Sequence, residues 1–233
     1  FVPKYYQYFE QIFYKSKIYE ACLLDFIDGI NTEDLYIDDP QVLIHIFLLM
    51  SKALQYIHSK NVVHRDIKLS NMIYDQNKDV ITIIDFTDAS SNDNPREGIR
   101  GTIDYISPEL AILLYNSEFS LLNSSVIMNT DEWKQSDIWS LGICFYILAT
   151  NTMPFGSVKK KDNIIVSNII NNKMIPIEEY YLFPEKDKTE SVIKTVINMC
   201  INRDPLYRSS CDRIVEFLSK NDDLSNTDFD ENS

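Results

Sequence analysis

The sequence predicts an α+β domain in which a short, strand-rich beginning is followed by a mainly helical remainder. Residues 1–27 contain two short strand patterns, separated by a turn at residues 14–17. Residues 39–58 carry apolar side chains at helical spacing, and residues 71–84 read as a hairpin. With 233 residues and 45% hydrophobic content, the chain can bury one sizeable core, which indicates one domain.

The elements follow in order along the chain. The helix predicted over residues 39–58 has a proline in its first turn, where proline is tolerated. Helical segments dominate from residue 110 to residue 219, apart from a polar stretch at residues 116–134. That stretch is predicted to be a surface loop with a few packed side chains, with a docking insert as the alternative. Residues 220–233 are acidic and poor in apolar side chains, which predicts a disordered tail.

Composition excludes several classes of function. A net charge of −13 excludes a broad nucleic-acid footprint; it indicates a solvated surface, with a basic protein partner as the weaker alternative. The longest apolar runs, at residues 42–50 and 138–149, are too short for a membrane span and are predicted to be buried helices. The cysteines form no CxxC pair, so we expect buried free thiols in an intracellular, cytoplasmic protein. They are Cys22, Cys144, Cys200 and Cys211.

The most informative stretch is residues 64–71, which read HRDIKLSN. An aspartate in the sequence IIDFT, Asp85, comes 19 positions after Asp66. This pattern resembles eukaryotic protein kinases, whose catalytic loop reads HRDxxxxN and whose magnesium loop reads DFG. Further motifs resemble the same family in the same order over residues 1–219. They are GTIDYISPE at 101–109, DIWSLG at 137–142, MPF at 153–155, and DP with Arg208 at 204–208.

The resemblance implies a protein-kinase-like fold and a set of catalytic residues. Asp66 would receive the proton of the substrate hydroxyl, and Lys68 would place positive charge near the moving phosphate. Thr102 would hydrogen-bond both of them, as in serine/threonine kinases. Asn71 and Asp85 would supply the oxygen ligands that Mg²⁺, a hard cation, requires. The implied cofactors are ATP and Mg²⁺, and the implied partner is a protein substrate with a serine or threonine.

The resemblance also implies a nucleotide site. Leu24 falls at the gatekeeper position, and the backbones of Asp25 and Ile27 would face the adenine base. Ile73 falls where an aliphatic side chain packs under adenine. Core packing stays open as the alternative for Leu24 and Ile73. Together with three phosphate-side residues, the implied set is Leu24, Asp25, Ile27, Lys68, Asn71, Ile73 and Asp85.

Some implied roles are structural. The activation segment would run from residue 85 to residue 109. Glu109 and Arg208 resemble the family's buried ion pair below it, and Asp137 resembles the residue that braces the catalytic-loop backbone. Tyr5, His64 and Phe86 fall on the hydrophobic column that links the two lobes.

Two positions depart from the family pattern. Thr87 stands where glycine is usual, and a β-branched residue enters positive φ only at clear cost, so Thr87 is predicted to restrict movement of the preceding Asp85 and Phe86. Gly98 stands where many relatives carry a phosphorylated threonine, which Arg65 usually contacts. One hypothesis is that the neighbouring Glu97 partly substitutes for that phosphate, with a solvated glutamate as the alternative. Ser90 and Ser91 are alternative phosphorylation sites.

Residues 1–27 resemble only the later strands and hinge of the small lobe, and residues 28–219 resemble the large lobe. No glycine-rich loop or phosphate-binding lysine precedes them. Because two small-lobe strands alone would leave an uncovered sheet edge, which is an aggregation hazard, we expect this sequence to be part of a longer protein. The leading hypothesis is a serine/threonine protein kinase. A pseudokinase or truncated binding module is the second. A small-molecule phosphotransferase of related fold is the third, and the GTIDYISPE segment argues against it.

Overall fold

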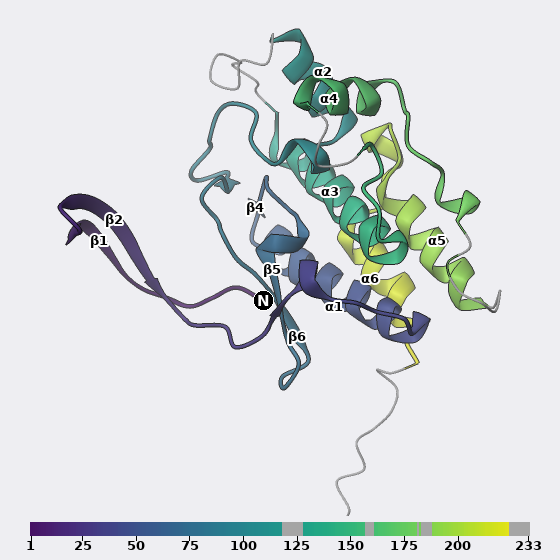
Figure 1. Cartoon of the computed structure of the whole chain (residues 1–233), viewed down its shortest axis with the longest axis horizontal. Helices are drawn as coiled ribbons and strands as arrows, with labels where there is room; N and C mark the ends of the chain where they lie inside the picture. The colour runs from purple at the N-terminus through teal and green to yellow at the C-terminus, as the bar shows by residue number, and fades with distance from the viewer. Residues whose placement is uncertain (118–127, 157–160, 181, 183–187, 224–233) are drawn as a thin grey trace, which may run out of the picture.

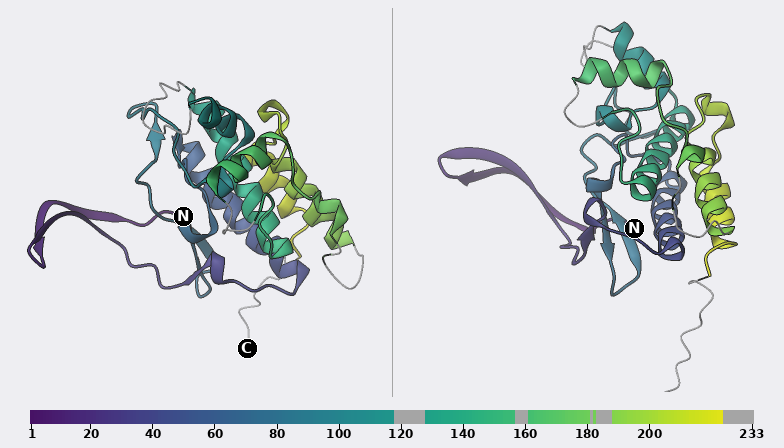
Figure 2. Two further views of the ribbon diagram at one scale, coloured as in Figure 1. Left: turned by 45° about the horizontal axis from the view of Figure 1, so that its top comes forward. Right: turned by 45° about the vertical axis from the view of Figure 1, so that its right-hand side comes forward.

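A mainly helical body forms most of the molecule, and a two-stranded hairpin extends from one side of it (Figures 1 and 2). This computed structural model describes residues 1–117, 128–156, 161–180, 182 and 188–223. The predicted α+β class is therefore confirmed, with strands gathered near the start of the chain and helices in the rest.

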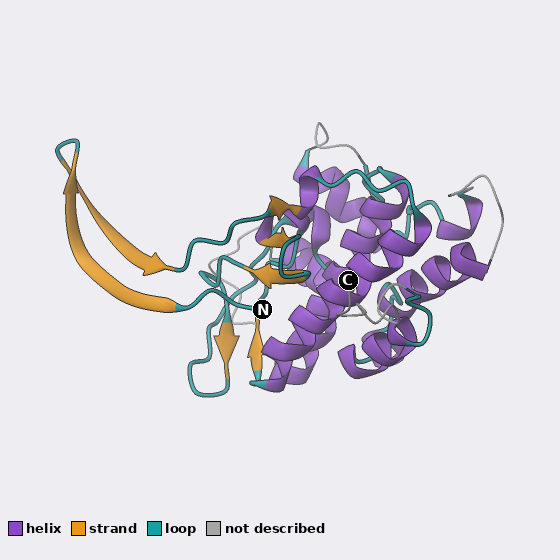
Figure 3. Cartoon of the chain, turned by 90° about the horizontal axis from the view of Figure 1, so that it is seen from below, coloured by secondary structure: helices purple, strands orange, loops and turns teal. Residues whose placement is uncertain are grey.

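The hairpin joins β1 (Tyr5–Tyr14) to β2 (Lys17–Leu24) in antiparallel pairing. Its turn residues Lys15 and Ser16 have φ of 47° and 64°, which suits the twist of a two-residue hairpin loop. The two predicted strands and their turn are therefore confirmed. Figure 3 shows the hairpin standing apart from the helices.

The prediction that all cysteines are buried is wrong for Cys22. Cys22 lies in β2 and is exposed, because the hairpin stands away from the helical body and its side chains have little to pack against. The thiols of Cys144, Cys200 and Cys211 are buried and free as predicted, and burial raises the pKa of each.

Short strands lie beside the helical body. The order β3–β5–β6 joins Ile30–Asn31, Met72–Asp75 and Val80–Ile83, and β5 and β6 form the predicted antiparallel hairpin. A second pairing joins β4 (Val62–Val63) to β7 (Ser90–Ser91). The helices are α1 (Pro40–Ser59), α2 (Pro108–Asn116), α3 (Thr130–Thr150), α4 (Asp162–Ile170), α5 (Lys188–Cys200) and α6 (Cys211–Ser219).

Helix α1 begins where its sequence predicts. The Asp39 carboxylate accepts from the backbone N–H groups of Gln41 and Val42, and Pro40 occupies the first turn. By length and apolar composition α1 could cross a membrane, but 67% of its most apolar window is buried inside the molecule. Its apolar residues from Leu43 to Ile57 pack in the core, so α1 serves as a core helix in this fold.

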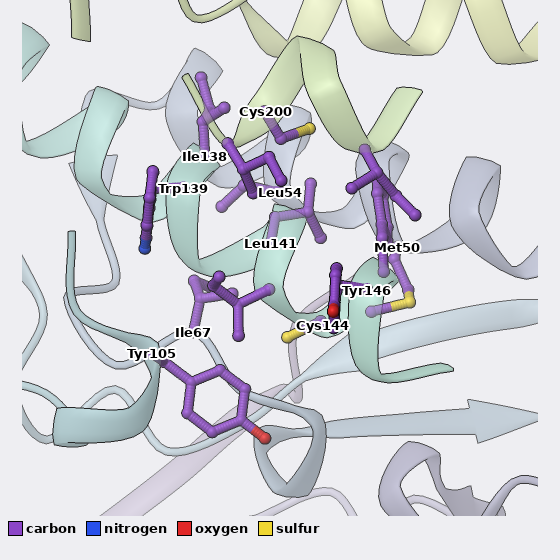
Figure 4. Close-up of a cluster of buried hydrophobic side chains, with 14 of the residues drawn as sticks. Met50, Leu54, Ile67, Tyr105, Ile138, Trp139, Leu141, Cys144, Tyr146 and Cys200 are labelled. Atoms are coloured by element: carbon purple, nitrogen blue, oxygen red, sulfur yellow. The ribbon is translucent and has the colours of Figure 1, made fainter. Parts of the chain in front are cut away.

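Helix α3 runs through the centre of the body and supplies side chains to the core (Figures 1 and 4). A capping box between Asn129 and Glu132 starts the helix at Thr130, so the end of the predicted loop at 116–134 is helical. Residues 118–127 of that stretch lie outside the described residues. Gly142 lets α3 and α5 approach closely, because a Cβ there would lie 2.5 Å from the Cβ of Cys200.

The prediction of a disordered tail from residue 220 onward is wrong for its first residues. Asp222 is fully buried, and its carboxylate lies 2.8 Å from Nδ1 of His45 on α1. The other ring nitrogen of His45 lies 2.8 Å from the carboxylate of Asp79, in the turn between β5 and β6. The start of the tail is thus packed because His45 offers it a polar partner, whereas residues 224–233 lie outside the described residues.

The His45 cluster predicts a pH-dependent stability. Burial lowers the pKa of His45, but hydrogen bonds to Asp222 and Asp79 outweigh it, so the pKa is raised overall. A raised folded-state pKa gives a stabilisation that is complete below the ordinary histidine value of about 6.5 and is lost as pH rises through the folded-state pKa. Replacing His45 with glutamine should cost about 1 kcal/mol more at acidic than at alkaline pH, since Asp79 is solvent-screened. Equal costs in denaturant titrations at the two pH values would contradict a stabilising role for protonated His45.

Candidate active site

The backbone of the catalytic loop, residues 64–71 between β4 and β5, is held by the carboxylate of Asp137 on α3. The backbone N–H groups of His64 and Arg65 donate to Asp137 over 2.8 and 2.9 Å, and Nε2 of His58 lies 3.0 Å from the same carboxylate. Asp137 is 2% exposed, so these donors satisfy a buried charge. The predicted bracing role of Asp137 is confirmed.

Asp66 lies at the centre of a compact hydrogen-bonded group. Its Oδ1 accepts from both the backbone N–H and the hydroxyl of Thr102, each over 2.8 Å. Its Oδ2 lies 2.7 Å from Nζ of Lys68 and 3.2 Å from Nδ2 of Asn71. Lys68 also donates to the Thr102 hydroxyl over 2.9 Å. The structure thus brings the four candidate catalytic residues together from the catalytic loop and the activation segment.

The surroundings of Asp66 keep its carboxylate ionised. Burial raises its pKa, but hydrogen bonds and charge from Lys68 and hydrogen bonds from Thr102 outweigh burial, and the pKa is lowered overall. At neutral pH Asp66 is therefore an oriented anion that can accept a hydrogen bond from a hydroxyl group.

The candidate metal ligands offer oxygen atoms of the kind Mg²⁺ prefers. Nδ2 of Asn71 donates to the backbone carbonyl and carboxylate of Asp66, which leaves Oδ1 of Asn71 for a cation. The Asp85 side chain is exposed and its Oδ1 accepts from Thr87, which leaves Oδ2. No group of three or more His, Cys, Asp or Glu side chains suited to a metal occurs among the described residues. The pair therefore fits Mg²⁺ that takes its remaining ligands from phosphate and water.

The physical basis predicted for Thr87 is wrong in this conformation. Positive φ falls on Asp85, at 61°, and Thr87 is not among the described residues with positive φ. Thr87 therefore bears no left-handed strain. Its hydroxyl instead donates to Oδ1 of Asp85 over 2.6 Å, and its backbone N–H lies 3.3 Å from the same oxygen. Thr87 thus orients the carboxylate that precedes it.

The candidate adenine residues do not share one cavity. A cavity of about 650 Å³ lies between the base of the hairpin, α1 and residues 85–87; Leu24 and Asp85 line it, but Ile27 and Ile73 do not. The backbone N–H of Asp25 donates to the carbonyl of Lys4 over 2.9 Å, so the hairpin itself uses that donor. Ile73 pairs within the sheet, is half-buried and lies against Gly29, outside the described hydrophobic core.

Part of the hydrophobic column is formed. The rings of His64 and Phe86 meet edge to face with centroids 4.9 Å apart, and Nε2 of His64 lies 3.0 Å from the carbonyl of Ile84. Tyr5 lines the same cavity as Phe86 but is 54% exposed, because the hairpin is not covered. These contacts fix the magnesium loop against the catalytic loop.

The ion pair predicted between Glu109 and Arg208 is confirmed. The two terminal nitrogens of Arg208 donate to the two carboxylate oxygens of Glu109, each over 2.7 Å. Arg208 also donates to the backbone carbonyls of Asn202 and Gln135, and its side chain is fully buried. The pair ties the end of the activation segment to the segment before α6.

The hypothesis that Glu97 replaces a phosphate is not supported by the geometry. Glu97 is exposed, and the Arg65 side chain donates to the backbone carbonyls of Arg96 and Gly98 instead. The carbonyls on either side of Glu97 thus take the role assigned to its carboxylate. Ser90, one of the candidate phosphorylation sites, lies in β7 and its hydroxyl accepts from the backbone N–H of Arg96 over 2.9 Å.

Sequence reasoning missed the side chain on which Arg65 packs. The guanidinium carbon of Arg65 lies 4.2 Å from the centre of the Trp133 ring. Trp133 stands four residues before Asp137 on α3, so the two share one helix face. That spacing is the signal that could have indicated Trp133.

Comparison with known sequences assigns the chain to a family. The family model described as a protein kinase domain matches residues 2–217. The chain belongs to the protein kinase family. A putative serine/threonine-protein kinase of Acanthamoeba polyphaga mimivirus is 29% identical to it over 83% of this chain and 61% of the relative.

Two yeast proteins resemble the kinase domain to a similar degree. A serine/threonine-protein kinase of Schizosaccharomyces pombe is 28% identical over 70% of this chain and 40% of its own length. A serine/threonine-protein kinase of Saccharomyces cerevisiae is 30% identical over 73% of this chain and 26% of its own length. The chain thus spans about three fifths of the viral relative and less of the yeast relatives.

Proposed function

We propose that this kinase domain serves to transfer the γ-phosphate of Mg·ATP to a serine or threonine hydroxyl of a protein. The observation that carries the proposal is the contact group around Asp66, in which Thr102 and Lys68 lie 2.8 and 2.7 Å from the two carboxylate oxygens. Phosphoryl transfer depends mostly on positioning and charge stabilisation, and this group supplies both.

Each residue has a distinct part in the proposed reaction. The Asp66 carboxylate accepts a hydrogen bond from the substrate hydroxyl and directs its oxygen toward the γ-phosphorus. As the new P–O bond forms, the bond from that phosphorus to the bridging oxygen of ATP breaks, ADP leaves, and Asp66 takes the hydroxyl proton. Lys68 neutralises charge on the transferred group, while Thr102 holds both side chains in place. Asn71 and Asp85 would hold Mg²⁺, which when bound neutralises phosphate oxygens.

The substrate class rests on two supports. Lys68 stands two positions after Asp66, as in serine/threonine kinases, and relatives bear serine/threonine-protein kinase names. The segment that ends in Glu109 is fixed by its ion pair with Arg208, and a fixed segment suits a peptide-binding platform. A protein hydroxyl is therefore the favoured acceptor over a small molecule.

A binding module without catalysis is the second candidate. It is favoured by the arrangement of the candidate adenine residues, of which Leu24 but not Ile27 or Ile73 lines the cavity beside Asp85. Nucleotide binding separates the two candidates, because the binding module requires neither ATP nor Mg²⁺.

The test is phosphorylation of a generic basic protein by the full-length protein with Mg·ATP. We expect transfer by the wild type and a loss of about 10²- to 10⁴-fold in Asp66→Asn, which keeps the shape but removes the proton acceptor. Asp131→Asn is the matched control, because its side chain is 93% exposed on the first turn of α3. Equal activity in Asp66→Asn would refute the assigned role. Absence of both transfer and ATP-induced thermal stabilisation in the wild type would favour the binding module.

A further inference from the structure

The Arg65 side chain is buried, and its direct hydrogen-bond and ring partners are uncharged groups. It is 5% exposed, and one terminal nitrogen donates to the carbonyl of Arg96 over 2.9 Å. The other terminal nitrogen donates to the carbonyl of Gly98, and the guanidinium stacks on Trp133. Two backbone carbonyls and an aromatic ring therefore contact this cation, while its buried Nε has no hydrogen-bond partner among the described residues.

Trp133 is placed by the same helix that holds the catalytic loop. The capping box of α3 fixes its first turn, and Trp133 follows that turn with 4% exposure. One turn later Asp137 accepts from the backbone N–H of Arg65. Helix α3 thus holds Arg65 at two points, by its backbone and by its side chain. In addition, Thr130 donates to Asn92 of the activation segment.

The charge of Arg65 persists in this environment. Burial lowers its pKa to about 10; Asp88 and Asp137 raise the pKa, and Arg100 and Arg96 lower it. The side chain therefore stays protonated at neutral pH. A desolvated cation over a tryptophan ring is attracted to it more strongly than an exposed cation is.

The hydrogen bond from Arg65 to the carbonyl of Gly98 helps to position Thr102 in the catalytic group. Gly101 follows, with φ of 113° and no room for a side chain, because a Cβ would lie 2.7 Å from the carbonyl of Arg65. Thr102 comes next and bonds Asp66. The position of Thr102 thus depends on a short stretch of chain whose ends both contact the Arg65 residue.

We propose that Trp133 is a positioning residue that holds Arg65 and, through it, the activation segment in its substrate-binding arrangement without phosphorylation of that segment. The inference rests on the proposed kinase function. Neutral partners do the work that an acidic or phosphorylated side chain would do, since each terminal nitrogen of the guanidinium donates to a backbone carbonyl.

The experiment compares Trp133→Leu with Trp133→Phe in the full-length protein after phosphatase treatment. Leucine removes the aromatic face, whereas phenylalanine keeps one. We expect Trp133→Leu to lower kcat/KM for the protein substrate about tenfold and to leave the KM for ATP unchanged. Trp133→Phe should restore most of the loss. Backbone amides of residues 92–101 should exchange hydrogen faster in Trp133→Leu than in the wild type and in Trp133→Phe.

Hydrogen exchange separates this inference from the proposed function, because it requires no catalysis. Faster exchange in Trp133→Leu together with an inactive wild type would support the positioning role of Trp133 and contradict the proposed kinase function. Unchanged exchange and activity in Trp133→Leu would contradict the positioning role of Trp133. Loss of wild-type activity on phosphatase treatment would also contradict it, because the activation segment would then depend on phosphorylation. If Trp133→Leu does not fold, Arg65→Lys gives the same exchange readout, because lysine lacks the planar fork that spans the two carbonyls.

Discussion

Replacing Arg208 with leucine is expected to lower the free energy of unfolding by about 3–5 kcal/mol, the largest stability effect anticipated for a single side chain here. The Arg208 side chain is fully buried and forms a two-pronged pair with Glu109. Removing the cation leaves the Glu109 carboxylate, whose side chain is only 23% exposed, without its main partner. It also strands the carbonyls of Asn202 and Gln135, which accept from the same side chain.

A matched control exists in α6. Lys220 pairs with Glu216 over 2.6 Å, but their side chains are 69% and 65% exposed. Replacing Lys220 with leucine should therefore change the unfolding free energy by less than about 1 kcal/mol. Denaturant titration of the two variants measures the contrast. The double variant Glu109→Leu, Arg208→Leu should be more stable than Arg208→Leu alone, because no charge is left unpaired; a double variant that is less stable would contradict this account.

Replacing Asp137 with asparagine is expected to lower kcat by about 100-fold with little change in the KM for ATP. The two carboxylate oxygens of Asp137 accept from the backbones of His64 and Arg65. An asparagine presents one oxygen and one NH₂ group, so one backbone donor faces another donor and the loop must shift. A shift of this loop moves Asp66, whose position relative to the reacting hydroxyl governs the rate.

Steady-state kinetics of the full-length protein would measure this effect. Asp212→Asn is a suitable control, because Asp212 is an exposed residue of α6 that accepts from Gln55 away from the catalytic loop. A normal kcat in Asp137→Asn would show that the loop keeps its place without a carboxylate. Circular dichroism should show both variants folded, which separates a displaced loop from a lost fold.

Local signals in the sequence predicted the parts of the molecule that depend on neighbouring residues. Helix α1 begins and ends within one residue of its predicted bounds, because Asp39 and Pro40 form a cap that short-range chemistry dictates. The group formed by Asp66, Lys68 and Asn71 was identified from a single short stretch, since the spacing of the motif is itself the signal.

Contacts between distant segments were predictable only where the family resemblance supplied them. Glu109 and Arg208 are 99 positions apart, and no periodicity connects them. Where the resemblance offers no guide, no local pattern indicates the partner. The pairs of His45 with Asp222 and of Arg65 with Trp133 depend on how helices and loops pack. The exposure of Cys22 was missed for a related reason, because a strand pattern does not reveal whether anything covers the strand.

The central place of α3 has a mechanical consequence. The catalytic loop, the turn before α2 and the segment before α6 all attach to this one buried helix, through Asp137, Ser140 and the backbone of Gln135. Because these three segments are all hydrogen-bonded to α3, thermal motion changes the distances between them less than it changes the position of each segment. Such a helix opens only when the whole domain opens. Heat should therefore disassemble the catalytic group in the same cooperative step that melts the fold.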